Sequence, residues 1–132
     1  MSQPDAIDEI LRIDAPLISN RRITTRDVEV GGRPIPKGEK ITILWASANR
    51  DEKVFGDPDA FCPHKNRDHN LLYGAGAHVC PGAPLARMEL RVLMEEFLSA
   101  VDTLKPAPED QPERAAFPTG GFSYLPMTIS KL

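Results

Sequence analysis

The sequence reads Tyr73-Gly74-Ala75-Gly76-Ala77-His78-Val79-Cys80-Pro81-Gly82-Ala83 directly before a strongly helical segment. Glycine accepts positive φ and has no Cβ, so Gly74, Gly76 and Gly82 allow a tight loop whose backbone approaches a flat ligand closely. Amide groups at the start of the following helix favour the thiolate form of Cys80. A fixed, electron-rich sulfur is what an axial ligand of iron requires, so we interpret this stretch as a binding site.

The stretch, with Ala83-Pro84-Leu85-Ala86-Arg87 after it, resembles the haem-binding signature of bacterial cytochrome P450. The family usually has phenylalanine where Tyr73 stands, which keeps an aromatic ring beside the sulfur. The resemblance runs from about Asp5 to the C-terminus, yet it corresponds to only the last third or so of a family member. It implies that Cys80 is the axial ligand of the iron of haem b. The other cofactor contacts that it implies are Arg22, Tyr73, Gly74, Gly76, His78, Gly82 and Ala86, with Arg22 and His78 at the haem propionates.

Length and composition agree with one domain over residues 1–132. A chain of 132 residues is long enough to bury a core of its own. Its net charge of −3, without a basic block, argues against nucleic acid as a partner. No apolar run approaches the roughly 18 residues of a membrane span. The first residues lack the pattern of a signal peptide, so we expect a cytoplasmic protein in which Cys62 and Cys80 stay reduced.

Helical spacing predicts two principal helices, over Asp5–Ile13 and over Pro84–Ala100. Alternation around Gly31-Gly32 predicts a tight hairpin of residues 28–30 and 33–35, and residues 40–45 are expected to form a further strand.

The remaining segments are rich in turn residues. Residues 51–70 show no period and are expected to form a long ordered loop, whereas residues 105–121 are expected to be proline-rich coil. Residues 122–129 are expected to form a short terminal hairpin around Pro126. The predicted fold class is therefore α+β, with two principal helices, a small antiparallel sheet and a long ordered loop. By resemblance it is the C-terminal part of the mainly-α cytochrome P450 fold.

Glu9 and Arg12 are three residues apart on one predicted helix, so their side chains can form an ion pair. On an exposed helix such a pair contributes only tenths of a kcal/mol. The resemblance instead implies the buried Glu-x-x-Arg pair of the family, which fixes this helix against the loop before the cysteine. The family often adds an arginine from that loop where Ala60 stands here, so Lys65 or Arg67 is the candidate for the third member.

A zinc site is the rival interpretation of the cysteines and histidines. Cys62, His64, His69, His78 and Cys80 offer sulfur and imidazole ligands within a short span. Their Cys-x-His and His-x-Cys spacings differ from those of structural zinc sites, and zinc does not explain the three glycines. We therefore expect Cys62 to be a small buried thiol.

The resemblance implies the haem-thiolate portion of a monooxygenase, an oxidoreductase that inserts one oxygen atom of O₂ into a small organic substrate. It implies a ferredoxin or flavin reductase as redox partner. No segment resembles the family's distal helix, so we expect the chain alone to be inactive. A natural short protein, a fragment with a missing N-terminal part and one half of a split assembly all remain open. A second hypothesis is a haem-free structural or interaction remnant that self-associates through its apolar faces.

Overall fold

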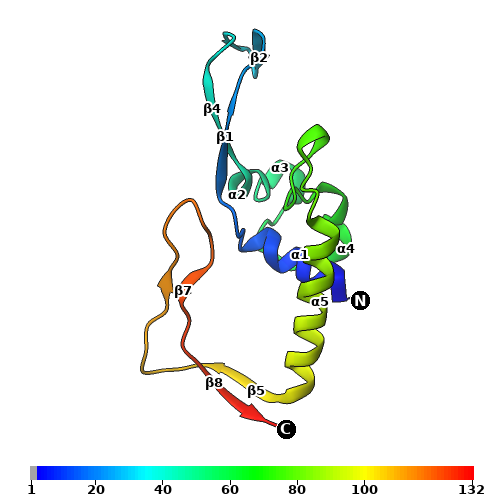
Figure 1. The fold of residues 1–132 in the computed structure, drawn as a ribbon, viewed down its shortest axis with the longest axis vertical. Helices are drawn as coiled ribbons and strands as arrows, with labels where there is room; N and C mark the ends of the chain where they lie inside the picture. Colours follow the sequence, from blue (N-terminus) through cyan, green and yellow to red (C-terminus); the bar gives the residue numbers. More distant parts are fainter. Residues whose placement is uncertain (1–2) are drawn as a thin grey trace.

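The computed structural model describes residues 3–132 and has an open arrangement of helices and two-stranded antiparallel sheets (Figure 1). Helix α1 (Gln3–Ile13) packs against the long helix α5 (Ala83–Ala100) and against the short helix α4 (Pro63–Asn66). Both predicted principal helices are therefore confirmed, with α1 beginning two residues earlier than Asp5 and α5 one residue earlier than Pro84. Pro84 lies in the first turn of α5, where a missing N–H group costs no helical hydrogen bond.

A narrow ribbon of strands extends away from the helices. The predicted hairpin is confirmed as β2 (Val28–Val30) paired with β3 (Arg33–Ile35). The predicted strand is β4 (Lys40–Leu44), and its partner is β1 (Ser19–Ile23), a segment that the sequence did not identify as a strand. Trp45 was expected to end the strand, but it begins the short helix α2 (Trp45–Ala48).

Residues 51–70 are more regular than expected. They contain helix α3 (Glu52–Phe55), helix α4 and the 3₁₀ helix η1 (Arg67–His69). These helices have three or four residues each, too few to produce a hydrophobic period in the sequence. Asp51 begins α3 by accepting a hydrogen bond from the amide of Lys53 at 2.9 Å. A second 3₁₀ helix, η2 (Gly76–His78), lies within the cysteine loop.

The prediction of a terminal hairpin over residues 122–129 is wrong. Strand β7 (Phe122–Tyr124) pairs with β6 (Glu113–Arg114), whereas β8 (Met127–Lys131) pairs with β5 (Val101–Pro106). The segment expected to be coil therefore contains a strand and the end of another. Pro126 lies between the two ladders, and its carbonyl oxygen accepts a hydrogen bond from the amide of Ala107 at 3.1 Å. Among the residues that the structure describes, the expected single sheet is thus replaced by four separate strand pairs.

The most deeply buried large side chains are mainly polar. Arg12 and Glu9 are 0% and 1% exposed, whereas the buried apolar residues of the described chain are Phe55, Pro63 and Ala83. In contrast, α5 exposes a row of large apolar side chains: Leu85, Met88, Val92, Leu93 and Leu98. A buried polar cluster at the α1 end therefore organises this structure more than an apolar core does.

Candidate functional site

The cysteine loop joins η1 to α5 and is closed by backbone hydrogen bonds. The amide of Cys80 donates to the carbonyl oxygen of Tyr73 at 2.9 Å, which brings the two ends of the loop together. Gly74 and Gly76 have φ of +78° and +66°, as predicted, because only glycine adopts these values without strain. Gly82 differs from the prediction, since its φ is −83° and it precedes α5 as the N-cap. A Cβ atom at Gly82 would lie 3.8 Å from Cys80 Sγ, in ordinary contact.

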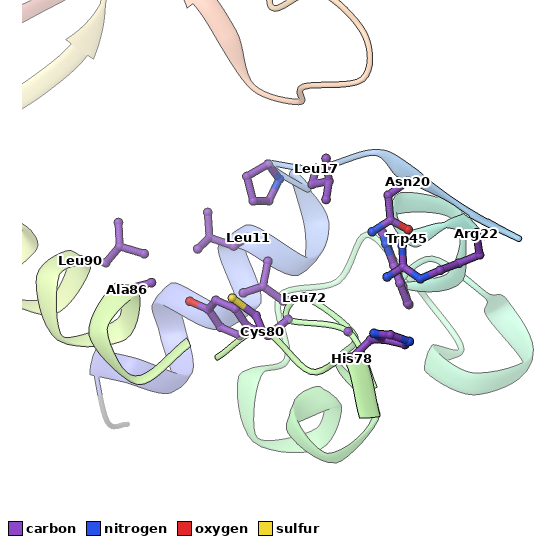
Figure 2. A pocket seen from close by; sticks show the side chains of 13 residues that line it. Leu11, Leu17, Asn20, Arg22, Trp45, Leu72, His78, Cys80, Ala86 and Leu90 are labelled. Atoms are coloured by element: carbon purple, nitrogen blue, oxygen red, sulfur yellow. The ribbon is translucent and has the colours of Figure 1, made fainter. Parts of the chain in front are cut away.

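Cys80 opens onto a pocket of about 410 Å³ (Figure 2). Its apolar walls come from α1, from the segment after it, from the residue before Tyr73 and from the first turns of α5: Leu11, Pro16, Leu17, Leu72, Ala86 and Leu90. The Cys80 thiol is free and exposed. The pocket therefore combines an accessible sulfur ligand with mostly apolar surroundings.

Six of the eight predicted cofactor contacts line this pocket, namely Arg22, Tyr73, Gly74, His78, Cys80 and Ala86. Gly76 and Gly82 shape the loop but are not among the lining residues. The sequence analysis did not select Asn20 and Trp45, which complete the wall near β1 and α2. Trp45 is the single tryptophan of the chain, and its place after an apolar strand was the only signal that could have drawn attention to it.

The polar side chains gather at one end of the pocket. In Figure 2, Asn20, Arg22 and Trp45 lie together with His78 nearby, whereas Leu11, Ala86 and Leu90 lie toward α1 and α5. Arg22 is half-buried, and its Nη1 donates to the carbonyl oxygen of Arg21 at 2.8 Å. The remaining guanidinium N–H groups leave Arg22 able to bind an acidic group at this end.

Tyr73 lies beneath a charged pair that joins α1 to α5. Arg87 places its guanidinium carbon 4.5 Å from the centre of the Tyr73 ring and contacts Asp8 Oδ2 at 2.8 Å. The Tyr73 hydroxyl is buried and has no hydrogen-bond partner among the described residues. Burial, and then the negative charge of Asp8, raise the pKa of this phenol, so Tyr73 is neutral near pH 7.

Glu9 and Arg12 form a buried pair with two short contacts. Arg12 Nε lies 2.8 Å from Glu9 Oε2, and Arg12 Nη2 lies 3.0 Å from Glu9 Oε1. Arg12 Nη1 also donates to the carbonyl oxygen of Asn49 at 2.7 Å, and Nη2 donates to that of Pro58 at 3.0 Å. Burial alone would raise the pKa of Glu9, but hydrogen bonds from Arg12, from the Cys62 amide and from Asn66 outweigh it and lower that pKa.

The third side chain of this cluster is Asn66, not Lys65 or Arg67. Asn66 Nδ2 donates to Glu9 Oε1 at 2.6 Å. Lys65 Nζ instead donates to the carbonyl oxygen of Phe55 at 3.2 Å, and Arg67 lies near Asp68 with an Nε–Oδ1 distance of 3.5 Å. A neutral amide therefore takes the place expected for a cation.

The zinc interpretation finds no geometric basis. Within residues 3–132, no three side chains of histidine, cysteine, aspartate or glutamate gather as a metal site would require. Cys62 is half-buried rather than buried, and its backbone amide donates to Glu9 Oε1 at 3.0 Å. Over the same residues, none of the helices is both long and apolar enough to span a membrane.

Comparisons with known proteins agree with one family. The family model for "Cytochrome P450" matches residues 4–130. Cytochrome P450 119 of Sulfurisphaera tokodaii is 45% identical over 92 residues, which are 70% of this chain and 25% of that protein. Putative cytochrome P450 126 of Mycobacterium tuberculosis is 46% identical over 102 residues, 77% of this chain and 25% of that protein.

Solved structures agree with the sequence relatives. Cytochrome P450 CYP150A6 of Mycobacterium marinum, in its substrate-free form, superposes with a TM-score of 0.88 at 30% identity, covering 97% of this chain and 34% of that one. The fold is thus that of part of a bacterial-type cytochrome P450. The chain belongs to the cytochrome P450 family, and it spans about a quarter of the length of the curated relatives it matches. None of these comparisons supports a haem-free, self-associating remnant.

Proposed function

We propose that this chain supplies the thiolate side of the haem site of a cytochrome P450 monooxygenase, with Cys80 as the axial ligand. The observation that supports the proposal best is the accessible Cys80 thiol in a mostly apolar pocket of about 410 Å³ with Arg22 and His78 in its wall. Family membership supports haem as the cofactor, which we take to be haem b. When bound, a thiolate-ligated haem supplies the O₂ chemistry of a monooxygenase.

The donor set fits that cofactor. Haem b is a flat apolar ring with two acidic arms, and leucines from α1, α5 and the adjoining loops provide apolar surface for such a ring. Arg22 and His78 are the groups of this chain that would bind the acidic arms. Gly74 would bring the backbone close to the ring because it has no side chain to keep the two apart. Ala86, a small residue on α5, leaves space beside the sulfur.

Hydrogen bonds from the buried Glu9 cluster and from the end of α2 support the position of the cysteine loop. Glu9 binds the amide of Cys62, and Asn49 binds the amide of Leu71 through Oδ1 at 2.7 Å, so the chain that leads into the cysteine loop is anchored to α1 and α2. We propose that this anchoring, more than apolar packing, fixes the position of Cys80.

We further propose that the 132 residues alone do not hydroxylate a substrate. The matched relatives have about three quarters of their length outside the matched region, and the apolar face of α5 is exposed here. In the working enzyme, polypeptide equivalent to that remainder would cover this face and exclude water from the pocket. A small organic substrate, and a ferredoxin or flavin reductase as electron donor, complete the proposed reaction.

Reconstitution tests both parts of the proposal. The purified chain is titrated with haem, and the absorption spectrum of the reduced protein under carbon monoxide is recorded. A red-shifted, thiolate-type Soret band is expected, and absence of haem uptake would contradict the proposed function. With reductase, O₂ and candidate substrates added, NAD(P)H use without hydroxylated product is expected. Efficient coupled hydroxylation would contradict the proposed need for further polypeptide, and size-exclusion chromatography would show whether a second copy provides it.

A further inference from the structure

Asp8 of α1 contacts the chain on both sides of the cysteine loop. Its backbone carbonyl oxygen accepts a hydrogen bond at 3.0 Å from Nδ2 of Asn70, which lies in the segment that enters the loop. Its carboxylate oxygen Oδ2 accepts a hydrogen bond at 2.8 Å from Nε of Arg87, and Nη2 of the same arginine also lies 2.8 Å from Oδ2. Arg87 belongs to α5, the helix that follows the loop. One residue of α1 therefore binds the chain before Cys80 and the chain after it.

Asn70 connects Asp8 to the backbone of the loop. Its side-chain oxygen Oδ1 accepts a hydrogen bond from the amide of Leu72 at 2.9 Å. Leu72 lines the pocket directly before Tyr73, and the carbonyl oxygen of Tyr73 accepts the hydrogen bond from the amide of Cys80. A shift of Leu72 would therefore be passed to Cys80 through this short series of contacts.

Arg87 connects Asp8 to the other side of the same loop. Its guanidinium carbon lies 4.5 Å from the centre of the Tyr73 ring. A planar guanidinium group can stack on an aromatic ring and still donate hydrogen bonds in its own plane. Arg87 thus joins three elements, namely α1 through Asp8, the start of the loop through Tyr73, and α5, to which it belongs.

We propose that Asp8, Asn70 and Arg87 are positioning residues that fix the separation of the two flanks of the cysteine loop and so hold the Cys80 sulfur where it can ligate iron. This inference rests on the proposed function. None of the three is among the residues that line the pocket, so they act through the loop rather than by touching the cofactor. Loss of these contacts should leave haem bound in the apolar pocket but reduce the share of it that Cys80 ligates.

The test measures that share in the full chain. Haem-loaded protein is reduced with dithionite under carbon monoxide, and the ratio of the red-shifted, thiolate-type Soret band to the unshifted band is recorded. Arg87→Ala should lower this ratio about fivefold, the factor for one net hydrogen bond. The matched control is Arg91→Ala, one helical turn further along α5, which should change the ratio less than about twofold. The two arginine side chains are 45% and 48% exposed, so exposure does not distinguish them.

Variants of Asp8 test whether the contacts act together. Asp8→Ala should lower the ratio as Arg87→Ala does, and the double variant should lower it no further, because the two side chains form one contact. Asp8→Asn keeps an oxygen that can accept from Arg87, so it should retain more of the ratio than Asp8→Ala. This comparison gives the same test if Arg87→Ala does not fold.

Melting temperatures separate positioning from stability, and each spectrum is recorded well below the melting temperature of its variant. A lower melting temperature with an unchanged ratio, or equal ratios for Arg87→Ala and Arg91→Ala, would overturn the positioning role and leave the proposed function intact. Lack of haem uptake, or lack of any red-shifted band, in the unaltered chain would overturn both.

Discussion

Substitution of Glu9 by alanine should destabilise this protein strongly. The carboxylate accepts four hydrogen bonds, two from Arg12 and one each from the Cys62 amide and Asn66 Nδ2. Arg12 is 0% exposed, so Glu9→Ala would leave its guanidinium buried without a counter-charge. Loss of one partner of a buried pair costs about 3–5 kcal/mol. In a domain of this size, that loss lowers the melting temperature by about 10 °C or more.

Thermal unfolding followed by circular dichroism measures the effect, and urea unfolding followed by Trp45 fluorescence checks it. The matched control is the exposed pair Arg91–Glu95, whose charged atoms are 3.9 Å apart and whose side chains are about half exposed. Because solvent screens this pair, Arg91→Ala should cost less than about 1 kcal/mol. A Glu9→Ala melting temperature no lower than that of Arg91→Ala would refute the assignment of stability to the buried cluster.

Three further predictions follow from the described contacts. Because the pKa of Glu9 is lowered in the folded protein, the ionised carboxylate stabilises the fold above the ordinary pKa of 4.5, and this stabilisation is lost as pH falls through the folded pKa. Urea titrations below about pH 5 should therefore show a steeper loss of stability for the unaltered chain than for Glu9→Gln. Equal slopes for the two proteins would contradict this. Tyr73→Phe removes a buried hydroxyl without a partner, so its melting temperature should not fall, and a drop of about 5 °C would reveal a missed contact. Gly120→Ala would place a Cβ in a steric clash with the carbonyl oxygen of Ala15, so it should lower the melting temperature and displace the adjoining pocket wall at Leu17. An unchanged melting temperature would show that the two segments separate easily.

The sequence was sufficient to predict those parts of the structure that depend on neighbouring residues. Glycines with positive φ, a proline in the first helical turn and apolar residues at helical spacing predicted the cysteine loop and α5, and Gly31-Gly32 predicted the β2–β3 hairpin. Each of these features depends on neighbouring residues, so their sequence pattern remains visible without any tertiary contact.

Structure that depends on distant partners was missed. Strand β1 reads Ser-Asn-Arg-Arg-Ile, a polar sequence that becomes a strand only because β4 pairs with it from 20 or so residues away. Asn66 reaches Glu9 from a segment 57 residues further along the chain, and a single asparagine in a segment without a hydrophobic period gives no sign of such a contact. The prediction of the terminal strand pairs failed for the same reason. A turn at Pro126 suggested that neighbouring segments pair with each other, whereas β8 pairs with the distant strand β5.

The measurement that tests the central claim most directly is the carbon monoxide spectrum of the reduced, haem-reconstituted chain in two cysteine variants. Cys80 opens onto the pocket, whereas Cys62 lies beside Glu9 and is not among the lining residues. The account predicts that Cys62→Ser retains the red-shifted thiolate Soret band and that Cys80→Ser loses it. Identical spectra of the two variants, or a thiolate band that survives in Cys80→Ser, would contradict the assignment of Cys80 as the axial ligand.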